Sequence, residues 1–163
     1  MKKMKSPIEQ PMRVVEFLNY NSDEKVEIPL YEARISAGFP SPAYDGVDTK
    51  LDLNDLLIRN RTATFFIRVE GESMKEAGIE NGDILIVDRS MPAMDGNIVI
   101  AVVNNEFLVK RYRKISGKHF LVPENPDYAP IEITPEMEAD IWGVVTASIH
   151  QFVRRNGSKS RAG

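Results

Sequence analysis

The sequence has 163 residues, of which 42% are hydrophobic and 28% are charged, and its net charge is -3. That length predicts one domain with additional arms, and the slightly acidic balance excludes a global basic field that would attract nucleic acid. The chain contains no cysteine. Disulfides and cysteine-rich metal sites are therefore excluded, which fits a reducing cytosol.

The sequence predicts neither a signal peptide nor a membrane span. Residues 1–7 are basic, but no apolar stretch follows them, so a secretory signal peptide is not expected. The longest apolar run, Ile98–Val103, is far shorter than the roughly 18 residues that a membrane span needs. We expect a soluble, cytoplasmic protein with no membrane partner.

Residues 1–50 are expected to form an N-terminal arm. Residues 1–25 are polar and charged apart from a short apolar stretch at Val14–Leu18, and residues 24–31 could form a short strand. Residues 33–50 contain two prolines and two glycines, which disfavour helix and central strand and predict an exposed connector that a protease could enter.

Residues 51–153 are expected to form a compact, mostly β domain with curled sheets. Residues 52–60 could begin it with a short helix whose leucines share one face. Alternation and turn signals then predict strands, with Asn104-Asn105 as a hairpin turn. The expected strands are 64–69, 83–88, 96–103, 106–113, 119–122, 131–133 and 140–152. Residues 154–163 are expected to be a disordered basic tail.

Ser73 lies in a turn that follows the 64–69 strand, in the sequence Gly71-Glu72-Ser73-Met74. Gly71 permits a tight turn, which could aim backbone amides, including that of Ser73, at a developing oxyanion. A serine hydroxyl needs an adjacent base to act as a nucleophile. Most serines in turns only form local hydrogen bonds, so Ser73 alone is a weak signal.

Lys110 lies within an apolar strand and is a candidate for that base. An ordinary lysine has a pKa of about 10.4 and must be desolvated to be neutral near pH 7. Alternation puts Lys110 on the same face as Leu108 and Tyr112. If that face is buried, Lys110 can act as a base. Periodicity alone favours the alternative, in which Phe107 and Val109 form the core and Lys110 is solvated.

The segment from Ala37 to Pro42 places small residues on both sides of one peptide bond, Ala37–Gly38. Small residues let a bond enter a narrow site, although a plain linker would have the same composition. A Ser–Lys pair with such a bond on the same chain suggests a protease that cuts itself.

Together these segments resemble the LexA/UmuD-like family of self-cleaving serine–lysine peptidases, and its UmuD branch most closely. The similarity covers roughly residues 28–150, and several separate motifs agree in order and spacing. The motifs are Ala37–Ala43, Leu51–Ile58, Phe66–Met74, Gly78–Asp88, Gly96–Ala101 and Glu106–Arg111.

The resemblance implies Ser73 as nucleophile, Lys110 as neutral general base and Ala37–Gly38 as the scissile bond, with no cofactor and no metal. It also implies a mostly β fold, a homodimer, cleavage promoted by a RecA-type recombinase filament on single-stranded DNA, and a later partnership with a Y-family, UmuC-like DNA polymerase subunit. The function it implies is that of a self-cleaving accessory subunit in translesion synthesis during the SOS response to DNA damage.

Two other functions stay open on the same fold. One is an interaction module that no longer cuts itself, and the other is a fragment of a LexA-like transcriptional repressor. Residues 1–25 provide no convincing DNA-reading helix, so sequence-specific DNA binding is not expected. The arm before Ile28 is longer than the resemblance leads us to expect, and the sequence assigns it no role.

Four other polar residues are weaker site candidates. His119 and His150 have no metal-ligand spacing and are expected to be ordinary surface or strand histidines. Asp83 and Asp88 bracket one strand on opposite faces, and we expect them to be solvated strand ends rather than an acid–base pair.

Overall fold

The computed structural model describes residues 11–18, 27–30 and 49–153 of the chain. Strands dominate this part, as the sequence predicts, and none of its helices is long and apolar enough to cross a membrane. The strands are β1 (Arg13–Leu18), β2 (Glu27–Leu30), β3 (Thr49–Asp52), β4 (Thr64–Glu70), β5 (Ile84–Asp88), β6 (Ile98–Val103), β7 (Glu106–Ile115), β8 (Lys118–Val122), β9 (Ile131–Ile133) and β10 (Ala139–Ile149).

Helical structure is confined to two short elements in the described ranges. Helix α1 (Leu53–Leu57) begins where the Asp52 side chain accepts a hydrogen bond from the amide of Asn54, 2.8 Å away. It ends before Ile58, whose backbone is extended, so it is shorter than the expected 52–60. A 3-10 helix (Lys75–Ala77) follows β4.

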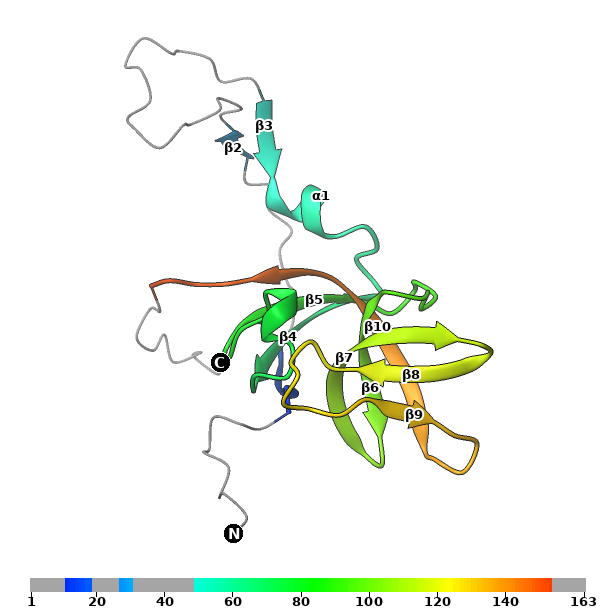
Figure 1. Ribbon diagram of the computed structural model, residues 1–163. Coiled ribbons are helices and arrows are strands. Elements are labelled where there is room, and N and C mark those ends of the chain that lie inside the picture. Colours follow the sequence, from blue (N-terminus) through cyan, green and yellow to red (C-terminus); the bar gives the residue numbers. More distant parts are fainter. Residues whose placement is uncertain (1–10, 19–26, 31–48, 154–163) are drawn as a thin grey trace, which may run out of the picture.

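Most strands form one antiparallel sheet in the order β1-β4-β5-β10-β6-β7-β8-β9. Strand β1 also pairs with β7, where Arg13 lies opposite Leu108, so β1, β4, β5, β10, β6 and β7 close into a barrel, and β8 and β9 extend it from β7 (Figure 1). The closing strand therefore comes from the N-terminal arm, from a stretch in which the sequence predicts no strand.

Local irregularities let this sheet curl. The register shifts in β1 between Val14 and Glu16 and twice in β10, and such bulges bend a strand and increase its twist. The β6–β7 hairpin turns at Asn104 and Asn105, whose φ angles of 50° and 64° fit the predicted two-residue turn. Strands β2 and β3 pair separately and stand away from the barrel (Figure 1).

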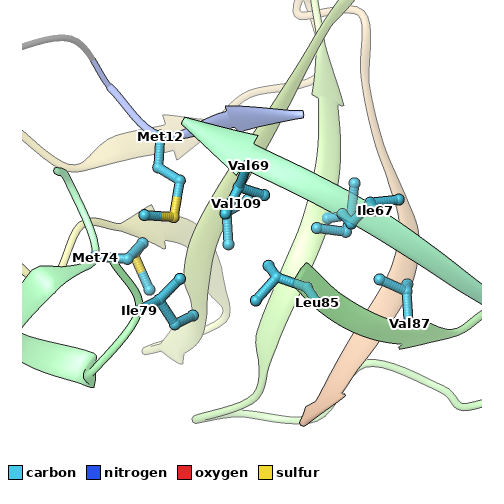
Figure 2. Packing of buried hydrophobic residues seen from close by; sticks show 9 residues of the cluster. Met12, Ile67, Val69, Met74, Ile79, Leu85, Val87 and Val109 are labelled. Carbon is cyan, nitrogen blue, oxygen red and sulfur yellow. The ribbon is translucent and has the colours of Figure 1, made fainter. Parts of the chain in front are cut away.

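Two apolar clusters fill the sheet. One gathers side chains from β1, β4, β5, β6, β7 and the turn after β4, and Figure 2 shows the side chains of Met12 and Met74 close together in it. Its buried members are Met12, Ile67, Val69, Met74, Ile79, Leu85, Val87, Ile100 and Val109. The other consists of Val99, Ala101, Val103, Leu108, Tyr112, Leu121 and Val144.

Candidate active site

The turn after β4 carries Ser73 into the interior. Gly71 has a φ of 111°, a value that L side chains rarely adopt, and its amide donates to Oδ1 of Asn81 at 2.9 Å. Farther along the turn, the side chains of Ser73 and Met74 are both fully buried. Since Met74 packs in the apolar cluster, the turn is anchored directly beside the serine.

A neighbouring segment also holds this turn. Asn125 is buried, and its Nδ2 donates to the carbonyl oxygen of Glu72 at 2.9 Å. The amide of Glu76 donates to the carbonyl oxygen of Glu124, also at 2.9 Å. Sequence reasoning missed Asn125, because a single asparagine in a loop gives no local sign that it supports a distant turn.

Lys110 reaches Ser73 from β7. Its Nζ lies 2.8 Å from Oγ of Ser73 and 3.2 Å from the carbonyl oxygen of Val109. The lysine is only 3% exposed. Burial disfavours the charged ammonium and lowers the pKa of Lys110 from 10.5 to about 8. A substantial fraction of this amine is therefore neutral near neutral pH.

The alternative in which Lys110 is solvated is wrong, because the middle of β7 is buried on both faces. Val109 packs in the cluster with Met12, while Leu108 and Tyr112 pack in the other cluster. Lys110 lies opposite Val99 of β6, which is fully buried. Alternation can identify a face, but here it could not show that both faces are covered.

Strand β1 also touches the pair. The amide of Met12, just before the strand begins, donates to Oγ of Ser73 at 2.8 Å, and the carbonyl oxygen of Met12 accepts from the amide of Val109 at 3.2 Å. The Met12 side chain is fully buried. Ser73 is therefore in contact with Lys110 on one strand and with Met12 at the start of another.

The structure does not describe every residue that the sequence singled out. Ser73 and Lys110 come together, whereas Ala37 and Gly38 lie outside the described residues, between β2 and β3. In the described ranges, no group of three or more histidine, aspartate or glutamate side chains could hold a metal ion.

The expectation that Asp83 and Asp88 are solvated strand ends is wrong. Both are buried, and each is bonded within the fold: Asp83 Oδ1 lies 2.6 Å from Nδ1 of His150, and Asp88 Oδ1 accepts from Oγ of Ser90 at 2.5 Å. His119 Nδ1 contacts the hydroxyl of Tyr112. None of these hydrogen bonds involves Ser73 or Lys110.

Comparison with known proteins identifies the family to which this chain belongs. The sequence matches the family described as "Peptidase S24-like" over residues 29–146. That span covers more than half of the chain and includes both Ser73 and Lys110. The chain belongs to the S24-like peptidases.

Three relatives define its position in the family. It is 43% identical over 139 residues to Protein MucA of Salmonella typhimurium, covering 85% of this chain and 94% of MucA. It is 48% identical over 123 residues to Protein SamA of Salmonella typhimurium, covering 76% and 85%. It is 34% identical over 139 residues to LexA repressor 2 of Xanthomonas campestris, covering 85% and 60%. MucA and SamA are UmuD-like proteins of SOS mutagenesis, and this chain is UmuD-like.

Proposed function

We propose that this chain is a self-cleaving accessory subunit of an error-prone DNA polymerase in the SOS response, and that it cuts its own Ala37–Gly38 bond with Ser73 and Lys110. The observation that carries the proposal is the buried 2.8 Å contact between Nζ of Lys110 and Oγ of Ser73. A serine beside a desolvated amine has the base that it needs to become a nucleophile.

In the first half of the reaction, Oγ of Ser73 attacks the carbonyl carbon of Ala37 while its proton passes to neutral Lys110. The amide of Ser73 helps to stabilise the oxyanion. The bond between Ala37 and Gly38 then breaks, and Lys110 gives the proton to the departing amine of Gly38. The result is an ester between Ala37 and Ser73.

In the second half, water attacks this ester. Lys110 accepts a proton from the water and returns it to Oγ of Ser73, which restores the site. Because enzyme and substrate share one chain, effective concentration replaces binding affinity. A partner that favours the arrangement in which the Ala37–Gly38 bond lies against Ser73 would accelerate cleavage by population shift.

The partners belong to the same proposal. The UmuD-like relatives support a role in SOS mutagenesis. We therefore propose a homodimer whose cleavage is promoted by a recombinase filament on single-stranded DNA and whose shortened form binds a Y-family polymerase subunit. Residues 38–163 would be the form that acts with the polymerase.

Mass spectrometry of the purified protein after alkaline incubation tests the cleavage. We expect a new N-terminus at Gly38 in the wild-type protein and none in Ser73→Ala or Lys110→Ala. An uncut wild-type chain, even with the activating filament present, would favour the interaction module that has lost its activity. Cleavage that persists in Ser73→Ala would exclude this serine as the nucleophile.

A further inference from the structure

We propose that the N-terminal segment 11–18 is a built-in blocking peptide that occupies the strand-binding cleft beside Ser73 and must leave before the Ala37–Gly38 bond can enter. This proposal rests on the proposed function and adds the regulation of the same site. In this structure the segment lies between β4 and β7, with which it pairs, and the side chain of Met12 is fully buried there.

The backbone of Met12 is held in the manner of a bound peptide. Its amide donates to Oγ of Ser73 and its carbonyl oxygen accepts from Val109, the residue before Lys110. Residues 13–18 then pair with β4, where Val14 lies opposite Val69 and Leu18 opposite Phe66. The segment thus extends a sheet edge, which is a common mode of peptide recognition.

This contact is unsuited to attack on the Pro11–Met12 bond. A peptide unit is planar, and a hydrogen bond along N–H places its acceptor, Oγ of Ser73, close to that plane. Addition to a carbonyl carbon requires an approach from above the plane. The Met12 amide also engages an Oγ lone pair that would make the attack. Met12 therefore occupies Ser73 without presenting a carbonyl carbon to it.

The segment pairs with β4 along its length, but only its start is fully buried, so little apolar burial is lost when the rest of the strand leaves. Met12 is fully buried, but Val15 and Phe17 are 42% and 47% exposed. Strand β1 pairs with β7 at Arg13 only. Beside that pairing lies a hollow of about 390 Å³, lined by Pro11, Arg13, Val14 and residues 105–108. The barrel is therefore incompletely closed where the blocking peptide meets β7.

A reversible lock tests the proposal in the full-length chain. Glu16 and Arg68 are paired Cα partners on neighbouring antiparallel strands, and such partners lie about 4.5–5.5 Å apart, within the range that a disulfide bridges. The chain has no other cysteine, so Glu16→Cys with Arg68→Cys forms one defined crosslink. Oxidation should slow self-cleavage about tenfold or more, because it removes the competent state, and reduction should restore it. Each single-cysteine variant is a control.

The opposite change should release the site. Met12→Asp would place a carboxylate in the apolar cluster and unseat the segment, so we expect cleavage at Ala37–Gly38 to accelerate about threefold or more. Val153→Asp, an exchange of an apolar residue for aspartate at an exposed position outside the segment, should leave the rate within about twofold of the wild type. Thermal unfolding of each variant identifies any general loss of stability.

The outcomes separate this proposal from the proposed function. Cleavage that is equally fast in the oxidised lock, or is not accelerated by Met12→Asp, would overturn the blocking role while leaving the self-cleaving function intact. If the wild type does not cleave itself but Met12→Asp does, both the blocking role and the self-cleaving function are supported. If neither the wild type nor Met12→Asp cleaves under any condition, the proposed function fails, and the blocking role fails with it.

Discussion

The amide of Glu124 donates a hydrogen bond to the carbonyl oxygen of Ser73 at 2.8 Å. The backbone of Ser73 is thus fixed by a loop between β8 and β9, and the side chain of the neighbouring Asn125 donates to the carbonyl oxygen of Glu72. These contacts lock the direction of Oγ, since a turn held on both sides has little freedom to rotate its serine away from Lys110.

We therefore expect Asn125→Ala to slow self-cleavage at least tenfold and to lower the free energy of unfolding by about 1–3 kcal/mol, because the partly buried carbonyl of Glu72 loses its donor. The pH at which the rate reaches half its maximum should not move, since Lys110 keeps its surroundings. Rates followed by gel electrophoresis across pH, with chemical denaturation, measure both effects. If Asn125→Ala is destabilised but cleaves itself at the wild-type rate, the loop contributes to the stability of the fold and not to cleavage.

The pH dependence of cleavage should follow the neutral fraction of Lys110. Burial lowers the pKa of Lys110 to about 8, so the uncharged amine is scarce well below that value and dominant above it. We expect the rate to rise about tenfold per pH unit at low pH, to gain about another tenfold between pH 7 and 9, and to level off beyond. A rate that is constant from pH 7 to 10 would exclude lysine as the base.

The sequence predicted the strands well because most of them are apolar runs bounded by turn signals. Strands β4 to β9 lie within two residues of their expected bounds at each end, and the Asn104-Asn105 turn carries its own conformational preference. Strand β1 could not be assigned in the same way. Among residues 11–18, only Met12 is fully buried. The segment therefore does not show the regular alternation of apolar and polar residues that identifies a half-buried strand.

The site was predicted only in part, because its chemistry depends on long-range packing. The spacing of Ser73 and Lys110 pointed to the pair through the family resemblance, but the burial of Lys110 depends on both clusters that cover β7. The contact from Met12 and the support from Asn125 depend on tertiary structure alone. Neither has a local signature that sequence patterns could reveal.

Lys110 should cost the folded protein stability at neutral pH. The pKa of Lys110 is lower in the folded state, about 8, than the 10.5 of an exposed lysine, so the unfolded chain binds more protons between these values and stability rises with pH through this window. The difference corresponds to about 3 kcal/mol. We expect Lys110→Met to raise the free energy of unfolding at pH 7 by about 1–3 kcal/mol, less the lost hydrogen bond to Ser73.

Urea denaturation of Lys110→Met and wild type at pH 7 and pH 10 measures this difference. The advantage of the variant should shrink toward pH 10, where Lys110 is neutral in the folded state and the same lysine in the unfolded chain has begun to lose its proton. A variant less stable than the wild type at pH 7 would contradict the desolvation cost assigned to this lysine.

Gly143 should not tolerate a side chain. It follows one of the register shifts of β10, and a Cβ there would lie 2.6 Å from Cγ1 of Val87 and 3.3 Å from the carbonyl oxygen of Asp88. We expect Gly143→Ala to lower the free energy of unfolding by about 1–3 kcal/mol through overpacking. Ser148→Ala, at an exposed position of the same strand, should change it by less than about 0.5 kcal/mol. Equal denaturation midpoints for the two variants would show that β5 and β10 can separate at low cost.

The cut chain should keep its N-terminal fragment for a time. Cleavage at Ala37–Gly38 would sever the connection between β1 and the rest of the barrel, but once the cut ends leave the site β1 can return to its pairing with β4 and to its contacts through Met12 and Phe17. The Phe17 ring lies 5.3 Å from that of Phe107 and 5.4 Å from that of Trp142. We expect residues 1–37 to co-elute with residues 38–163 in gel filtration at micromolar concentration.

Phe17→Ala should promote release of the fragment, because edge-to-face ring pairs contribute about 0.5–1.5 kcal/mol each beyond the area they bury. Val15→Ala, which alters an exposed side chain of the same strand, should not. Immediate loss of the fragment from the wild-type protein would mean that β1 stays in the barrel only through its covalent connection.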